Sequence, residues 1–182
     1  MEVDKPFRAV TVVCQDDDTG APIEDVNIEW LKQCNTLKNF VEDCDDIDMV
    51  PVCNMKVVTM KKIIEYMSYH YEHPLTEEQK QSFDITAIPE WDLAYISVDD
   101  EMLADLFMSG NFLEYPELMR LCAKKYHIEF RKIIDQVGHE HAAEEIGRRF
   151  NIKCDIPADL LAKIKVQNSF LIKALQSAQN SK

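Results

Sequence analysis

Glycine is scarce in this sequence, which has four glycines among 182 residues. Loops that bind phosphate groups use several closely spaced glycines, because a backbone without side chains can wrap around the phosphate oxygens. The sequence contains no P-loop motif, and the GxSxG motif of many serine hydrolases is also missing. The shortage of glycine therefore argues against a phosphate-binding loop and against this class of hydrolase.

Long apolar runs and paired cysteines are missing as well. No window holds 18 consecutive apolar residues, so the sequence predicts no membrane-spanning helix. The N-terminal segment MEVDKPFRAV is acidic and has no apolar core, unlike a secretory signal, so we expect a cytoplasmic and nuclear protein with reduced thiols. None of the six cysteines forms a CxxC pair, which argues against a zinc site and against a disulfide framework.

Basic residues are few in the first part of the chain. Residues 1–100 carry 8 Lys and Arg against 22 Asp and Glu, within a chain of net charge −13. Proteins bind nucleic acids and anionic membranes largely through Lys and Arg, so we expect neither as a partner. The acidic surface can steer a basic partner toward the chain or can simply maintain solubility, and composition leaves both explanations open.

Hydrophobic residues make up 46% of the chain, which is enough for a buried core. Short β-branched segments predict strands, and apolar residues at three- and four-residue spacing predict helices. The strands are expected at 8–14, 21–28 and 49–52, a turn at 16–20, a surface loop at 71–90, and helices at 29–42, 57–70, around 102–107, at 116–138, at 142–150 and after Pro157. The predicted fold class is therefore mixed α+β, with a small sheet surrounded by helices and followed by a helical C-terminal extension.

An acidic segment offers the first candidate metal site. Asp43, Asp45 and Asp48 are spaced like part of a calcium-binding loop. Such a loop needs a ligand oxygen at its fifth position and glycine at its sixth, where this chain has Ile47 and Asp48. The match is too incomplete to predict calcium binding.

Histidine spacing offers no stronger site. The segment HEH at 139–141 does not match the HExxH motif of zinc proteases. His141 and Glu144 can share one helix face, but without a second such pair we interpret them as the solvated start of a helix. His70 and His73 flank the predicted loop and are expected to be exposed. We therefore expect no metal, no cofactor and no enzymatic activity.

The most apolar region, residues 88–121, has a helical pattern that is interrupted by the segment SGNF at 109–112. A catalytic site is one explanation, and a docking surface for another protein is the other. In a docking surface, Gly110 would let a partner backbone approach closely, while Asn111 would supply hydrogen bonds and Phe112 apolar area. Spacing alone favours the interpretation of Phe107 and Phe112 as ordinary core residues.

Several short motifs occur in a fixed order along the chain. They are MVPV at 49–52, KKIIEY at 61–66, IPEWD at 88–92, GNFL at 110–113 and FNI at 150–152. In this order and at this spacing, the sequence resembles the Skp family, the adaptor subunits of Skp–cullin–F-box (SCF) ubiquitin ligases, over roughly residues 8–170. Elongin C is a related but shorter adaptor, and it lacks the helical tail expected here after Phe150.

The resemblance implies a domain organisation and a function. It implies a BTB/POZ-like cullin-binding domain at 8–128, a helical F-box-binding extension at 129–175, and flexible termini at 1–7 and 176–182. Members of the family are non-catalytic adaptors that bridge a cullin scaffold to F-box substrate receptors and so promote ubiquitination and degradation.

The resemblance also assigns residues to the two partners. The cullin surface matches Phe107, Asn111 and Phe112, and Phe112 stands where the family usually has tyrosine. The F-box surface matches the apolar residues Leu118, Leu121, Ile146, Phe150, Ile152, Leu160, Ile164 and Phe170. An apolar stripe on short helices cannot bury itself, which favours a partner or self-association.

Two departures from the family pattern fall on the F-box side. The segment between Cys122 and Phe150 is longer than the family norm by roughly two helical turns, about 11 Å if it is helical. Phe170 replaces the C-terminal tryptophan of the family. BTB-like domains also self-associate, so a homodimeric assembly protein that has lost one ligase contact is the alternative function.

Overall fold

The computed structural model describes residues 8–14, 21–44, 46–153 and 155–179. They fall into two compact units, Met1–Lys125 and Tyr126–Lys182. The predicted turn at 16–20, and the parts of the predicted flexible termini at 1–7 and 180–182, lie outside the described residues, as do Asp45 and Cys154.

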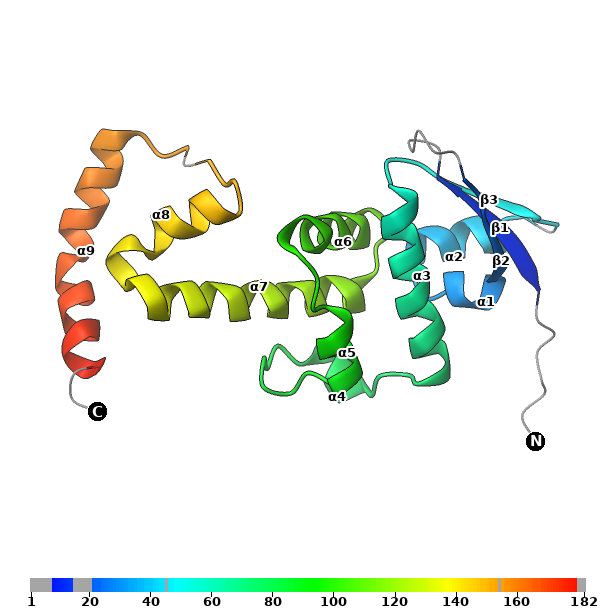
Figure 1. Cartoon of the computed structure of the whole chain (residues 1–182), viewed down its shortest axis with the longest axis horizontal. Helices are drawn as coiled ribbons and strands as arrows, with labels where there is room; N and C mark the ends of the chain where they lie inside the picture. The colour runs from blue at the N-terminus through cyan, green and yellow to red at the C-terminus, as the bar shows by residue number, and fades with distance from the viewer. Residues whose placement is uncertain (1–7, 15–20, 45, 154, 180–182) are drawn as a thin grey trace. The chain divides into compact units, whose positions relative to one another are not determined.

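The first unit contains a three-stranded sheet with the order β2-β1-β3 (Figure 1). Strand β1 (Ala9–Cys14) is antiparallel to β2 (Ile23–Asn27) and parallel to β3 (Met49–Val52). Alternate residues of the strands are buried, so one face of the sheet points into the core. All three strands predicted from the sequence are confirmed.

The helix predicted at 29–42 is in fact two helices, α1 (Ile28–Leu31) and α2 (Asn35–Glu42). Cys34, between them, has an extended backbone with φ −112° and ψ 143°. The break lets the N–H groups of Asn35 and Thr36 donate to the carbonyl oxygens of Glu114 and Leu113. These long-range hydrogen bonds satisfy donors that a helix start leaves free, which periodicity cannot reveal.

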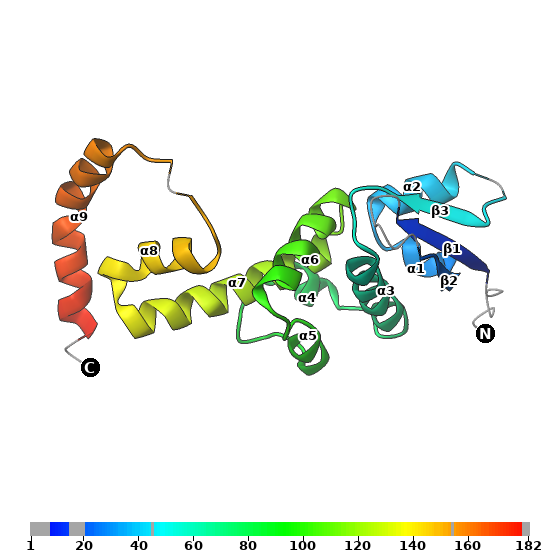
Figure 2. The same cartoon turned by 45° about the horizontal axis from the view of Figure 1, so that its top comes forward.

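Helix α3 (Val57–Glu72) contacts both β1 and β2 and buries one side against the sheet, and Figure 2 shows it beside the strands. The surface loop predicted at 71–90 contains a short helix, α4 (Glu77–Gln81). Its start is a capping box, in which the Thr76 hydroxyl accepts from the Gln79 N–H and the Gln79 side chain accepts from the Thr76 N–H. A further short helix, α5 (Glu90–Tyr95), follows Pro89.

Helix α6 (Asp100–Phe112) runs through residues 109–112 without a break, so the predicted interruption is wrong. Gly110 is buried, and a Cβ there would lie 3.2 Å from Met119 Cγ and 3.6 Å from Leu118 Cδ2. The glycine thus lets α7 (Pro116–Val137) pack closely on α6, rather than admitting a partner backbone. Between the two helices, the Tyr115 N–H donates to the Gly110 carbonyl at 2.8 Å.

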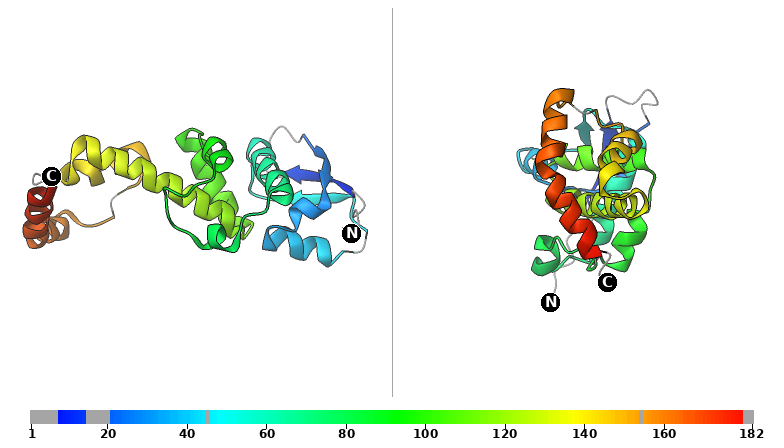
Figure 3. Two further views of the ribbon diagram at one scale, coloured as in Figure 1. Left: turned by 90° about the horizontal axis from the view of Figure 1, so that it is seen from below. Right: turned by 90° about the vertical axis from the view of Figure 1, so that its left-hand side faces the viewer.

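The second unit contains the C-terminal part of α7, then α8 (His139–Arg149) and α9 (Ala158–Gln179). Helix α8 folds back along α7 (Figures 1 and 3), and Gly138 makes the reversal with φ 77°, a conformation that favours glycine. Ile133 and Ala142 are buried in this unit. The predicted stop at Gly138 is confirmed.

The mixed α+β class is confirmed, with three strands and nine helices in the described part of the chain. None of the helices in the described ranges has the length and apolar content needed to cross a membrane.

Candidate protein interaction surfaces

The cullin-side residues predicted from the sequence lie at the C-terminal end of α6. Phe107 is half-buried, whereas Asn111 and Phe112 are exposed. Met108 is even more exposed, at 65% against 43% for Phe112. Because Met108 and Phe112 are four residues apart on one helix, their side chains lie on the same face. We call the exposed set Met108, Asn111 and Phe112 the α6 patch. Met108 was not predicted, although its four-residue spacing from Phe112 could have indicated it.

A hollow of about 430 Å³ separates the α6 patch from the start of α3. Met55 and Thr59 contribute to its lining from the α3 side. Lys56, on the same side, has its Nζ 2.9 Å from Asp105 Oδ2 and 3.0 Å from Glu101 Oε1. Hydrogen bonds to Asp105 and then Glu101 hold the pKa of Lys56 above its usual value. The hollow therefore combines apolar side chains with a charge cluster of one lysine and two carboxylates.

The backbone below the α6 patch is held in place. The hydroxyl of Thr36 donates to the Phe112 carbonyl at 3.2 Å, and the Thr36 N–H donates to the Leu113 carbonyl at the same distance. Glu114 follows the helix with φ 52°, which ends α6 directly after the patch. Asn111 and Phe112 are thus presented on a fixed helix end.

The F-box-side residues predicted from the sequence differ in exposure. Leu118 and Leu121 are buried in the first unit, where Leu118 packs beside Gly110. The other described residues lie in the second unit: Ile146, Phe150 and Ile164 are half-buried, and Ile152 and Leu160 are 56% and 47% exposed. The side chain of Phe170 lies outside the described residues.

Phe150 is positioned by rings and charges of its own unit. Its ring centroid lies 5.4 Å from that of Tyr126 and 5.3 Å from that of Phe130, both in edge-on geometry. The neighbouring Arg149 donates to the buried carboxylate of Glu129 at 3.0 Å. The end of α8 thus presents two apolar side chains close together in sequence, the ring of Phe150 and the exposed side chain of Ile152. They lie where the chain leaves α8 toward α9.

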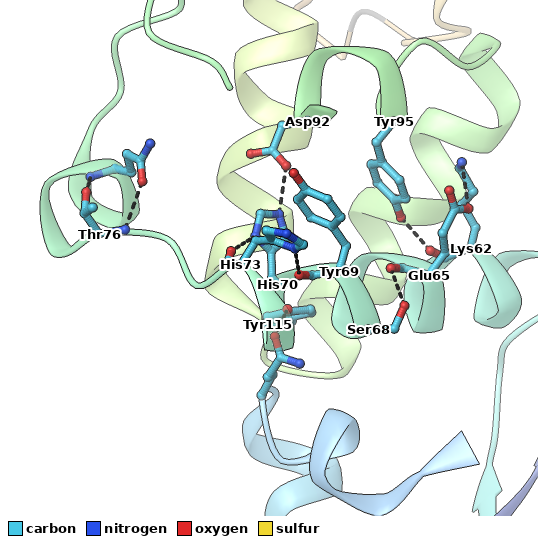
Figure 4. A network of polar contacts seen from close by, with 12 residues as sticks. Lys62, Glu65, Ser68, Tyr69, His70, His73, Thr76, Asp92, Tyr95 and Tyr115 are labelled. Atoms are coloured by element: carbon cyan, nitrogen blue, oxygen red, sulfur yellow. Dashed lines mark hydrogen bonds and ion pairs between the residues drawn. The ribbon is translucent and has the colours of Figure 1, made fainter. Parts of the chain in front are cut away.

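The IPEWD motif at 88–92 attaches α5 to α3. Asp92 Oδ1 lies 2.8 Å from His70 Nε2, and the His73 carbonyl lies 3.1 Å from His70 Nδ1 (Figure 4). Trp91 stacks on Tyr69 with ring centroids 3.7 Å apart. The expectation that His70 is exposed is wrong, because packing of α5 on α3 buries it to 7% exposure. His73 is exposed, as expected.

The candidate metal-binding residues of the described part of the chain do not come together in a cluster. Within the described ranges, no group of three or more His, Cys, Asp or Glu side chains is arranged to hold a metal ion. His141 and Glu144 are both exposed on α8. Burial raises the pKa of the Cys34 thiol to about 11 and that of the Cys122 thiol to about 12, so both are protonated at neutral pH and poorly suited to metal binding or nucleophilic attack.

Known proteins resemble this chain over most of its length. No protein-family model matches it. The chain is 28% identical over 137 residues to the E3 ubiquitin ligase complex SCF subunit sconC of Talaromyces stipitatus, which covers 74% of this chain and 81% of that protein. It is 25% identical over 138 residues to the SCF ubiquitin ligase complex proteins SKP1a and SKP1b of Dictyostelium discoideum, covering 74% of this chain and 80% of each relative. These relatives support the assignment of the chain to the Skp family, as a divergent member.

Proposed function

We propose that the chain is a non-catalytic adaptor of an SCF-type ubiquitin ligase. It connects a cullin scaffold to F-box substrate receptors and so promotes ubiquitination and degradation of their substrates, in the cytoplasm and nucleus. The observation that carries the proposal is the similarity to named SCF subunits over 74% of the chain.

The α6 patch supports a cullin contact on the first unit. It combines two exposed apolar side chains with an exposed amide, on a helix end that is fixed by hydrogen bonds to Thr36. Interface centres typically join apolar area with a few directed polar groups, and a fixed backbone loses little freedom on binding. Phe107, half-buried on the same helix, completes the proposed contact.

The second unit supports an F-box contact. Ile152 and Leu160 leave apolar area exposed, and Phe150 is half-buried beside them in sequence. An F-box segment with an apolar face would cover these side chains and remove them from water. Leu118 and Leu121 remain predicted F-box residues, although both pack in the interior of the isolated chain.

The direct test is co-purification of the chain with a cullin N-terminal domain and with an isolated F-box segment, with the mass of each complex measured by size-exclusion chromatography and light scattering. We expect a 1:1 complex with each and a ternary complex when all three are mixed. Binding to neither, with a stable homodimer instead, would reject the adaptor proposal in favour of the self-associating alternative.

Matched variants separate the two contacts. Ile152→Ser should weaken F-box binding, whereas Lys153→Ser, at the neighbouring exposed position, should not. The N–H of Ile152 donates to the Gly147 carbonyl, and this backbone bond survives the substitution. Cullin binding should be unchanged in both variants, because the residues proposed for it lie on α6. Equal weakening of F-box binding by both substitutions would count against the proposed surface.

A further inference from the structure

A pocket of about 320 Å³ opens in the first unit between α3, the segment that follows α3 and the start of α7. Its walls include Tyr66, His70, Tyr71, Leu75, Tyr115 and Glu117. The volume lies at the lower end of the range that bound ligands occupy. None of the residues proposed above for the cullin or the F-box lines this pocket, so neither contact explains it.

Aromatic rings form much of the wall. The ring of Tyr66 lies 4.3 Å from that of His70 and 5.6 Å from that of Tyr115, centroid to centroid. The Tyr115 ring is held in place, since its hydroxyl donates to Gln33 Oε1 at 3.1 Å. Tyr71 is 43% exposed. The faces of such rings carry partial negative charge and attract cations.

Two polar groups of the pocket make no hydrogen bond to any other residue that the structure describes. Tyr66 is 1% exposed, and no hydrogen bond to its hydroxyl is found among the described residues. Within the same part of the chain, the carboxylate of Glu117 makes no hydrogen bond or ion pair. The pKa of Tyr66 is raised mainly by burial, and the negative charges of Asp92 and Glu117 contribute to the same shift. These charges indicate a negative potential around the ring. The Tyr66 hydroxyl and the Glu117 carboxylate together fit a guest that donates hydrogen bonds and carries positive charge.

The lysine in the pocket lining already has an acidic partner, and the histidine already has polar ones. Lys80 contributes to the lining, but its Nζ lies 2.8 Å from Glu77 Oε1. The ring of His70 is held between Asp92 and the His73 carbonyl. The first hundred residues carry a large excess of acidic groups, which would draw a basic segment toward this part of the chain.

We propose that this pocket receives a cationic side chain of a protein partner, with arginine as the preferred guest. A guanidinium group can stack on a tyrosine ring and donate to a carboxylate at the same time, whereas an ammonium group cannot stack in this way. The guest is a residue of a partner chain because the pocket is open at the surface and the acidic surroundings extend well beyond it. This site is additional to the proposed adaptor contacts and does not depend on them.

The test is an NMR titration of the ¹⁵N-labelled full chain with a five-residue peptide that carries one central arginine. The matched probe is the same peptide with citrulline, which has the shape of arginine without its charge. We expect saturable shifts at residues that line the pocket, and at least tenfold weaker binding of the citrulline peptide. Nα-acetylarginine amide should bind more weakly than the peptide. If Nα-acetylarginine amide bound as tightly as the arginine peptide, the guest would not have to belong to a partner chain, which would contradict the proposal. If the arginine peptide caused no saturable shifts, the proposed site would be overturned.

Substitutions distinguish the pocket from general attraction to an acidic surface. Glu117→Gln should weaken arginine binding about tenfold, because it replaces a charge-assisted hydrogen bond with a neutral one. Tyr71→Leu should weaken it about threefold through loss of the ring face. Glu78→Gln removes the same charge from an exposed position of α4 outside the pocket and should leave binding unchanged. Equal effects of Glu117→Gln and Glu78→Gln would overturn the proposal, provided that thermal unfolding shows all variants to be folded.

Discussion

His70 and Asp92 form a buried polar contact between α3 and α5, with His70 Nε2 lying 2.8 Å from Asp92 Oδ1. The two side chains are 6% and 4% exposed. This contact gives the IPEWD motif a structural role: Pro89 precedes α5, Trp91 stacks on Tyr69, and Asp92 fixes the helix to His70. The motif thus holds α5 on α3, within the same unit as the α6 patch.

Removing one partner of this contact should destabilise the fold strongly. Asp92→Ala leaves a buried imidazole nitrogen without a partner, and we expect a loss of about 3 kcal/mol in the free energy of unfolding. The double variant Asp92→Ala with His70→Leu should lose less than the sum of the two single variants, by at least about 1 kcal/mol. Urea denaturation of the four proteins measures this coupling.

A substitution on the same short helix provides the control. Glu90 is exposed at the start of α5, and Glu90→Ala should change the free energy of unfolding by no more than about 0.5 kcal/mol. A large effect of Glu90→Ala would show that α5 is sensitive to any change. Strictly additive effects at His70 and Asp92 would show that the two side chains do not stabilise each other.

Gly110 allows a second stability test, because a side chain at this position would point toward α7. In Gly110→Ala, the new methyl group would lie 3.2 Å from Met119 Cγ, and the flexible methionine can move away. Since alanine favours a helix by about 1 kcal/mol over glycine, we expect a net change within about 1 kcal/mol in either direction. Gly110→Leu has no such room and should cost about 2 kcal/mol or more through overpacking. The two variants are compared by urea denaturation, and equal stabilities would contradict the close helix packing.

Periodicity predicted the strands and the long helices because their buried residues repeat at regular intervals. It failed where long-range contacts override the local pattern. The break between α1 and α2 allows backbone N–H groups at the start of α2 to donate hydrogen bonds to the carbonyls of Leu113 and Glu114, which are distant in sequence. Helix α4 has no buried residue, so apolar spacing could not reveal it, although the Thr76-to-Gln79 capping box could have.

The candidate site was only partly predictable. Resemblance to the Skp family pointed to Asn111 and Phe112, and both are exposed, but it could not indicate that Gly110 faces inward. Burial of His70 depends on a partner 22 residues away, for which neither periodicity nor composition gives a signal. The aromatic pocket combines residues of α3, α7 and the segment after α3, and a sequence shows them only as separate tyrosines.

The proposed cullin contact is tested by truncating the side chain of Phe112. Phe112→Ala should weaken binding of the cullin N-terminal domain about thirtyfold, which corresponds to the roughly 2 kcal/mol lost at the centre of an interface. Its side chain is 43% exposed, so the free energy of unfolding should change little. Leu93→Ala, which truncates an apolar side chain that is 49% exposed on α5, is the matched control and should bind normally. Isothermal titration calorimetry measures both affinities, and equal losses would remove Phe112 from the proposed contact.

Alkaline pH should destabilise the first unit through its buried thiols. Burial raises the pKa of Cys34 to about 11 and that of Cys122 to about 12, from the usual 9.0, because the interior disfavours the thiolate. A raised pKa in the folded state means that the folded protein keeps protons that the unfolded chain releases. The associated stability is therefore complete below pH 9 and is lost as the pH rises toward 11 and 12. By pH 10 each thiol should account for a loss of about 1 kcal/mol.

Single cysteine variants test this origin of the pH dependence. Cys122→Ala should be less stable than the parent at pH 7, since it shortens a buried side chain, but it should lose about 1 kcal/mol less between pH 8 and pH 10. Cys53 is exposed, and Cys53→Ala should follow the pH dependence of the parent. Urea midpoints at pH 7, 8, 9 and 10 supply the comparison. If the parent and Cys122→Ala lost stability in parallel, the alkaline effect would have to come from other groups. The buried tyrosines Tyr66, Tyr95 and Tyr115 are then the candidates, because burial also raises their pKa values above the usual 10.0, and their contribution begins as the pH approaches 10.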